Sequence, residues 1–378
     1  MKILIVIPSF PVNVEDTKGG VASALSNLLK GFEISDISVR VVSFNREVSQ
    51  TIIVNYSHNI TIYYTAESKL PHVINFIFKG SATIKNHIRE FDPVIIHYVM
   101  SGYILLTKFF GLLHKIPMVT IHGIPFAEAR QKEKIKDKLV WYSNGIVEFL
   151  LCPSNIIHLS NYSAKLHGNN NKSIVAIIPN AINPSYFDLP LKTTTNNRIL
   201  YIGSIDTNKN IMFLLKALKA LVENKFYFTL AVLGGFVEDN YKEEVLSYIK
   251  DNQLEKNVTF YGWVPQQKLK SILSESDILM VSSKQESLPM VIAEAMSAGK
   301  VVVSSITGGT SEMITNGVDG FLYNISAIEN VLPILEKLYD NDKLVCQIQG
   351  KAKQKAMATY HCNMVAQKTI AFYKSVLK

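Results

Sequence analysis

Two glutamates, Glu286 and Glu294, stand in the chain with seven residues between them, in a stretch whose local structure has few alternatives. Residues 277–282 are an apolar run short enough for a buried strand, and Pro289 opens a helical-period run that Gly299 ends. Residues 301–304 read as a second strand. Strand, helix and strand in close succession predict a right-handed crossover in a parallel sheet, with ligands at its carboxyl edge. Glu286 falls at that edge.

The start of this helix is predicted to bind an anion. Pro289 in the first turn lacks a backbone donor, whereas Leu288, Met290 and Val291 keep theirs, and the helix dipole adds positive potential. Glu294 lies on the same helix face as Met290, about one turn further in. A site that binds only phosphate gains no affinity from two flanking carboxylates. Carboxylates can, however, accept hydrogen bonds from pairs of hydroxyl groups. A ligand with hydroxyls next to its phosphates, such as a nucleotide sugar, fits this pattern.

The continuation of the stretch carries a family resemblance. After Glu294 come Ala-Met-Ser-Ala-Gly and then Gly-Gly-Thr-Ser-Glu at 308–312, and the whole resembles the retaining glycosyltransferases with the GT-B fold, the group-1 or family-4 type that includes glycogen synthase-like enzymes. The resemblance implies that Glu286 holds a donor-sugar hydroxyl, that Glu294 holds the ribose hydroxyls, and that UDP is the default nucleotide. The alternative is a solvated helix face with two glutamates on it.

Two glycine-containing loops are candidates for contact with the diphosphate. Gly19 and Gly20 follow the first predicted strand, where backbone N–H groups can approach a phosphate closely, although a tight turn before a helix is the alternative. Gly203, Ser204 and Lys209 lie in a loop that resembles the family's strand-to-helix loop with an arginine and a lysine. Lys209 is the predicted partner of the leaving group, and Ser204 stands at the arginine position, which puts donor affinity in doubt.

Two histidines and one aromatic turn complete the candidate site. His97 and His122 are expected to end strands; His97 is interpreted as structural, whereas His122, in Thr-Ile-His-Gly, resembles the family histidine that faces the donor sugar and phosphate. Its predicted role is catalytic, as a positioned hydrogen-bond and partial proton donor to developing charge. The resemblance to the family implies that backbone groups around Trp263 and Val264 contact the base, with packing as the alternative for Trp263.

The chain as a whole is predicted to form two domains. Its 378 residues are too many for one ordinary hydrophobic core. Its composition, 48% hydrophobic and 19% charged, excludes a disordered chain. Strand-like runs are 3–7, 38–44, 60–65, 94–98, 119–122, 147–152 and 174–178, followed by 199–202, 228–233, 258–261, 278–281 and 301–304. The fold class is therefore α/β. With the resemblance, it becomes two Rossmann-like doubly wound parallel-sheet domains facing across a cleft.

We expect an N-terminal acceptor-side domain at 1–183 and a donor domain at 184–360. The resemblance to the family further implies a C-terminal helix within 361–378 that crosses back to the first domain. Residues 325–378 are mostly of helical period. Three cysteines, odd in number and without metal spacing, favour a reducing compartment. The short apolar start, which stops at Pro8, is interpreted as a strand rather than a signal peptide, and no apolar run is long enough to cross a bilayer. A cytoplasmic location follows, either free or peripheral on the inner face of the cell membrane.

A metal or other cofactor is not expected. Residues Asp340, Asn341 and Asp342 resemble the metal-binding Asp-x-Asp of the other large glycosyltransferase fold. They lie between two segments of helical period, however, where Asp342 is more simply a helix N-cap. By resemblance to the family, the leaving phosphate itself takes the acceptor proton, so no carboxylate nucleophile is needed.

The charge distribution bears on the acceptor. The net charge is +8, and residues 1–185 carry 18 Lys and Arg against 12 Asp and Glu, whereas residues 186–378 carry 21 against 19. Part of the excess lies in a run of basic residues mixed with Glu128, Glu133 and Asp137: Arg130, Lys132, Lys134, Lys136 and Lys138. We expect docking on an anionic membrane surface, with a lipid-diphosphate-linked saccharide as acceptor in bacterial surface polysaccharide synthesis. A solvated helix is the alternative for this run.

Three other functions remain open at this point. A nucleotide-sugar epimerase that transfers nothing shares the fold, and a catalytically silent sugar-nucleotide-binding subunit is conceivable because Ser204 replaces an arginine. Binding of nucleic acid is suggested only by a pI of about 9.1, without a motif or an aromatic-basic pattern, and is not favoured.

Overall fold

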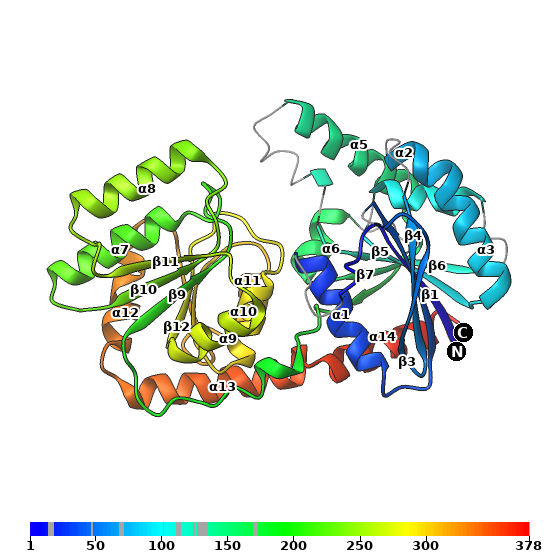
Figure 1. Ribbon diagram of the computed structural model, residues 1–378. Coiled ribbons are helices and arrows are strands. Elements are labelled where there is room, and N and C mark those ends of the chain that lie inside the picture. Colours follow the sequence, from blue (N-terminus) through cyan, green and yellow to red (C-terminus); the bar gives the residue numbers. More distant parts are fainter. Residues whose placement is uncertain are drawn as a thin grey trace. The chain divides into compact units, whose positions relative to one another are not determined.

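The computed structural model describes residues 1–13, 19–46, 48–67, 72–100, 102–110, 115–123, 125–126, 135–168 and 173–377 (Figure 1). The chain forms two compact units, Met1–Ala181 with Cys362–Lys378, and Ile182–His361. The predicted boundaries after residues 183 and 360 lie within two residues of these breaks.

Unit 1 is built on an eight-stranded sheet with the order β3-β4-β2-β1-β5-β6-β7-β8. Its strands are β1 (Lys2–Ile7), β2 (Ser38–Asn45), β3 (Ile52–Ser57), β4 (Ile60–Ala66), β5 (Ile95–Val99), β6 (Ile116–Ile121), β7 (Asn155–His158) and β8 (Ile174–Ile177). All neighbours pair in parallel except β3, which runs antiparallel to β4 at the edge. The central strands are continuous apolar runs because both of their faces are covered.

The helical segments of unit 1 are α1 (Gly20–Phe32), α2 (His72–Asn75), η1 (Phe76–Gly80), α3 (Ser81–Phe91), η2 (Gly102–Phe110), α5 (Ile135–Leu151), α6 (Asn161–His167) and α14 (Cys362–Ser375). The last of these confirms the predicted C-terminal helix on the first domain, because α14 packs beside α1 (Figure 1). Gly31 allows this approach, since a Cβ there would lie 2.3 Å from the Cys362 carbonyl oxygen.

One strand prediction for unit 1 is wrong. Residues 147–152 were expected to form a strand, but residues up to 151 belong to the long helix α5. Their apolar run is too short to distinguish strand from helix by periodicity, and the packing of the preceding turns settles it as helix. The strand that follows is β7, which the sequence pattern missed, as it missed β3 and β14.

Unit 2 has a six-stranded, fully parallel sheet with the order β11-β10-β9-β12-β13-β14. Its strands are β9 (Arg198–Ile202), β10 (Thr229–Leu233), β11 (Val258–Gly262), β12 (Ile278–Val281), β13 (Val301–Ser305) and β14 (Phe321–Tyr323). Its helical segments are η3 (Pro184–Tyr186), α7 (Ile211–Glu223), α8 (Asp239–Asp251), α9 (Gln266–Glu275), α10 (Met290–Ser297), α11 (Thr310–Met313), η4 (Ile328–Asn330), α12 (Leu332–Leu338) and α13 (Asp342–Tyr360). The predicted doubly wound architecture is confirmed in both units.

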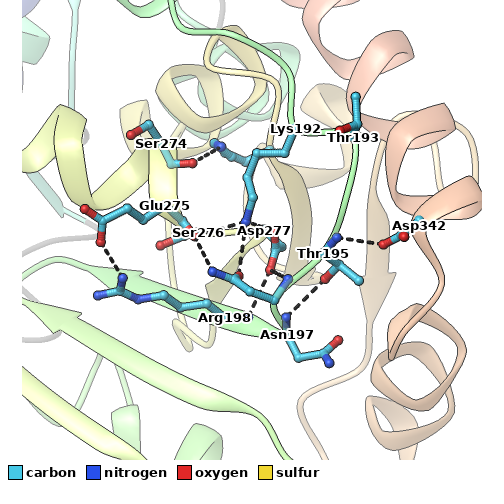
Figure 2. Close-up of polar contacts among 12 residues, drawn as sticks. Lys192, Thr193, Thr195, Asn197, Arg198, Ser274, Glu275, Ser276, Asp277 and Asp342 are labelled. Atoms are coloured by element: carbon cyan, nitrogen blue, oxygen red, sulfur yellow. Dashed lines mark hydrogen bonds and ion pairs between the residues drawn. The ribbon is translucent and has the colours of Figure 1, made fainter.

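A buried carboxylate ties the segment before β9 to the start of β12 (Figure 2). Asp277 is fully buried; it pairs with the Lys192 ammonium at 2.5 Å and accepts from the backbone N–H groups of Asn196 and Arg198. Arg198 in turn pairs with Glu275 at 2.6 Å. These bonds hold the amino end of β9 beside that of β12, the two strands whose opposite ends carry the candidate site.

The Asp-Asn-Asp run has structural partners. Asp340 accepts from the Asn197 side chain, Asp342 accepts from the Thr195 backbone, and Asn341 accepts from the Leu344 N–H. Asn341, rather than the predicted Asp342, is therefore the N-cap of α13. Across the described ranges, no cluster of three or more His, Cys, Asp or Glu is arranged to hold a metal ion.

Within the described ranges, the search for a helix with the length and apolar character to cross a membrane found none.

Candidate active site

The candidate site of unit 2 lies where its strand order reverses. β9 has β10 on one side and β12 on the other, and the connections after β9 and β12 leave from the same edge of this parallel sheet. Such a switch point is where open α/β sheets bind ligands. The loop after β12 leads into α10, which begins at Met290 with Pro289 as its N-cap, rather than with the proline in the first turn as predicted.

The loop after β9 is ordered by its own polar groups. The Asp206 carboxylate accepts from the backbone N–H groups of Asn208 and Lys209, at 3.0 and 2.8 Å, and from the Ser204 hydroxyl at 2.6 Å. The Tyr201 hydroxyl donates to the Ser204 carbonyl. Ser204, at the position where the family has an arginine, therefore helps to shape the loop.

This loop places Lys209 against Glu286. The Lys209 ammonium lies 2.5 Å from Glu286 Oε1, which also accepts from the Ser283 hydroxyl at 2.7 Å. The side chains of Lys209 and Glu286 are 30% and 12% exposed, so ligand atoms can reach both. The Ser282 hydroxyl donates to the Lys209 carbonyl and joins the two loops a second time. Two predicted site residues are thus brought into contact.

Glu294 lies one turn inside α10 in an apolar environment. Burial raises the pKa of its carboxyl from 4.5 to about 7. Within the described part of the chain, its carboxylate makes neither a hydrogen bond nor an ion pair. Its charge adds to burial in raising the pKa of the neighbouring Tyr186 hydroxyl. Glu294 as a whole is half-buried. An acid whose carboxyl is desolvated in this way costs stability, and such groups cluster at functional sites.

The remaining candidates of unit 2 surround the same core. Leu288, Met290, Val291 and Val264 are half-buried against the apolar cluster that holds β12 and α10. Trp263 is 75% exposed, and its indole stands on Gly235, where a Cβ would lie 2.5 Å from the ring nitrogen. Because Trp263 is so exposed, it does not pack in the core. The indole is accessible to a planar ligand.

Gly203 and Gly234 lie at a close crossing of two strand ends. A Cβ at Gly234 would lie 1.8 Å from the Gly203 carbonyl oxygen, and the φ of Gly234 is +135°. The N–H of Gly203 donates to the carbonyl of Leu233. Gly234 is therefore required by this crossing, whereas a Cβ at Gly203 would meet no atom closer than 3.9 Å.

In unit 1, the switch point lies between β1 and β5. Gly19 is the N-cap of α1 with a φ of +91°, and Gly20 is the first residue of the helix. A Cβ at Gly19 would meet nothing within 4 Å, so its backbone faces open space. The predicted helix start is confirmed, and the phosphate contact stays a prediction.

His97 was predicted to end a strand, but it lies in the middle of β5. It is 1% exposed, and its ring nitrogens lie 2.7 Å from the Tyr373 hydroxyl and 2.7 Å from the Thr120 hydroxyl. Both ring nitrogens are used, and burial lowers the pKa of His97 to about 3. These contacts support its structural interpretation.

His122 directly follows β6 and lines a pocket of unit 1 together with His97, Thr120, Ala24 of α1 and Thr369 of α14. Burial lowers the pKa of His122 to about 4, so its imidazole is neutral near pH 7. A neutral ring can donate a hydrogen bond to developing charge but cannot supply the proton of an imidazolium. Of the two roles predicted for His122, hydrogen-bond donation therefore remains, and partial proton donation does not.

Part of the predicted basic run, Arg130, Lys132 and Lys134 with the two glutamates, lies outside the described residues. The sequence analysis missed two supporting residues of unit 2. Asp206 could have been found from Asp-Thr-Asn-Lys, a pattern typical of an Asx turn. Ser283 has no such signal, because its role depends on the position of Glu286.

The chain is similar to known proteins in sequence and in fold. The chain is 24% identical over 275 residues to the UDP-Gal:alpha-D-GlcNAc-diphosphoundecaprenol alpha-1,3-galactosyltransferase of Escherichia coli, covering 68% of each chain. Its fold is similar to that of sucrose-phosphate synthase from Thermosynechococcus elongatus, with a TM-score of 0.78, 15% identity and coverage of 100% and 99%. It is also similar to Anabaena Alr3699/HepE in complex with UDP, with a TM-score of 0.75, 17% identity and coverage of 99% and 100%.

The two Rossmann-like sheets and these neighbours define the fold as that of the GT-B glycosyltransferases. Residues 185–355, which hold every candidate of the donor site in unit 2, match the family model of the group 1 glycosyl transferases. The match covers this region of the chain, and unit 2 is in this respect similar to that family.

Proposed function

We propose that the protein transfers a sugar from a nucleoside-diphosphate sugar, with UDP as the preferred nucleotide, to a hydroxyl of a lipid-linked saccharide, with retention of anomeric configuration and without a metal or other cofactor. The observation that carries the proposal is the contact of Lys209 with Glu286 at the switch point of unit 2, with Glu294 one turn into the helix that follows. This contact supports the proposal because one cation and two acids near the switch point suit a ligand with phosphates and hydroxyls.

The proposed roles follow from the atoms available. The Lys209 ammonium has three N–H donors, of which Glu286 takes one, so two can reach diphosphate oxygens. Both hydrogen bonds of Glu286 in the described structure use Oε1, which leaves Oε2 to accept from a donor-sugar hydroxyl. Glu294 would accept from the ribose hydroxyls, and Trp263 would lie along the base. Leu288, Met290 and Val291 would offer backbone donors to the phosphates.

In the transfer itself, the bond from the anomeric carbon to the diphosphate oxygen breaks and a bond from that carbon to the acceptor oxygen forms on the same face. The departing diphosphate takes the acceptor proton. The protein contributes orientation and charge stabilisation, chiefly from Lys209. The contacts of Gly19, Gly20 and His122 with the donor stay predictions, in which His122 acts as a neutral hydrogen-bond donor.

The lipid-linked acceptor is supported by the name of the Escherichia coli relative, whose acceptor carries a diphosphoundecaprenol group. The same relative uses a UDP-sugar. Synthesis of a bacterial surface polysaccharide or glycoconjugate in the cytoplasm is the process in which such a reaction would take part.

The proposal is tested with Glu286→Gln and Lys209→Gln, with the exposed Glu243→Gln as a matched control. Thermal shift against a panel of nucleotide sugars identifies the donor, because a ligand at 100 times its dissociation constant stabilises by about 2.7 kcal/mol. Transfer to a lipid-linked saccharide, measured with excess chelator, should fall at least roughly tenfold in both site variants and stay unchanged in the control. An inverted product anomer would contradict retention, and an altered free nucleotide sugar without acceptor would indicate an epimerase.

A further inference from the structure

Helix α5 (Ile135–Leu151) exposes large apolar side chains and buries one carboxylate, that of Glu148. Seven large apolar residues are exposed on it. One of them, Val140, lies apart, and the other six, with exposed fractions between 39% and 78%, form what we call the α5 apolar face: Ile135, Leu139, Tyr142, Ile146, Phe149 and Leu150. At about 100° per residue, these positions fall within one arc of about 100°. The face is therefore one continuous stripe along the whole helix.

The opposite side of α5 is firmly held by unit 1. Glu148 is 3% exposed, and its Oε1 lies 3.1 Å from the His167 Nε2 of α6. Gly145 lies under the Phe126 ring, where a Cβ would be 2.8 Å from the ring atoms, and α5 also packs on η2. Because a buried carboxylate is anchored inward, the helix cannot roll over to bury the stripe against its own unit.

The charges beside the stripe indicate what covers it. Lys136 and Lys138 fall on either side of the arc, each within about 40° of its edge, whereas Asp137 falls on the side away from it. Lysines at the borders of an apolar stripe can bury their stems and keep their ammonium groups at an anionic surface. The excess of basic residues in the first half of the chain has the same sign.

We propose that the α5 apolar face inserts into the interfacial layer of an anionic lipid bilayer, with Lys136 and Lys138 at the headgroups. The helix would lie along the membrane, as amphipathic helices with basic borders do. This inference rests on the proposed function, because membrane binding would bring the protein to a lipid-linked acceptor. It depends, however, on residues that take no part in donor binding.

The test uses the full chain and vesicles of phosphatidylcholine with or without phosphatidylglycerol, followed by flotation. The double variant Leu139→Ser with Phe149→Ser should bind anionic vesicles at least roughly tenfold more weakly, because it removes two large apolar side chains from the stripe. The matched control, Ile34→Ser with Val237→Ser, removes two residues that are 73% and 66% exposed elsewhere and should bind as the wild type does.

The lysines are tested separately. Lys136→Gln and Lys138→Gln should each weaken anionic binding about fivefold at low salt, and the difference should shrink at about 0.5 M salt. Thermal shift with the nucleotide sugar, measured on every variant, should be unchanged, so that a failure of donor binding is distinguished from a failure of membrane binding.

Equal vesicle binding by wild type and the Leu139→Ser, Phe149→Ser variant would overturn the inference. So would a wild-type dimer that the same substitutions convert to a monomer without any change in vesicle binding, because the face would then be covered by a second copy of the chain.

Discussion

Replacement of the acid Glu294 by its neutral amide should stabilise the protein at alkaline pH and impair donor binding. Glu294 is half-buried, and desolvation of its carboxyl raises its pKa from 4.5 to about 7. Because it makes no hydrogen bond or ion pair within the described residues, little offsets the cost of ionising it. Glu294→Gln removes the charge and keeps the shape of the side chain.

The sign of the effect follows from proton linkage. Below about pH 4.5 both the folded and the unfolded chain hold the proton, so the pKa difference contributes nothing. As the pH rises from there toward about 7, the unfolded chain releases the proton while the folded chain keeps it, and the folded state loses stability. Above about pH 7 the full cost, about 3 kcal/mol, is present.

Urea unfolding of wild type and Glu294→Gln at several pH values measures this cost. We expect the stability advantage of the variant to widen by about 2–3 kcal/mol between about pH 5 and about pH 8. In unit 2, which has 180 residues from 182 to 361, this corresponds to a rise of roughly 5–10 °C in Tm at the higher pH. Glu243→Gln, an exposed control in α8, should show no such trend.

The donor provides the second half of the test. Hydroxyls that donate to Glu294 favour its ionised form, so wild-type affinity for the nucleotide sugar should rise by up to about tenfold per pH unit below pH 7 and then level off. The variant should bind weakly at every pH. A stability difference that does not change with pH would refute the burial argument, and full donor affinity in the variant would refute the assigned role.

Three further predictions concern the frame of unit 2. Asp277→Asn should lower the free energy of unfolding by about 3–5 kcal/mol in urea titrations, because it leaves a lysine charge without its partner. Gly234→Ala should abolish the donor-induced thermal shift and destabilise the fold, whereas Gly350→Ala, where a Cβ meets nothing, should stabilise by up to about 1 kcal/mol. Lys209→Gln should change stability by no more than about 1 kcal/mol, since the pair is partly exposed, yet lower donor affinity roughly tenfold by calorimetry.

The periodicity of the chain by itself indicated two α/β domains with mainly parallel sheets, and it placed Glu286 after a buried strand at a carboxyl edge. Buried parallel strands are short apolar runs, and each crossover carries a helix of recognisable period, so local pattern and topology agree. The strand–helix–strand unit around α10 could be predicted from residues 277–304 because the signals that start and end each of its elements lie within a few positions.

Other features were decided by the tertiary structure, because they depend on contacts between residues distant in sequence. The run at 147–152 is apolar enough for a strand, and its helical form depends on the burial of Glu148 against His167. Lys209 meets Glu286 across 77 positions, and His97 meets Tyr373 across 276. Sequence period reports the geometry of neighbouring residues, whereas the pKa of Glu294 and the exposure of the α5 apolar face are set by which distant segments pack around them.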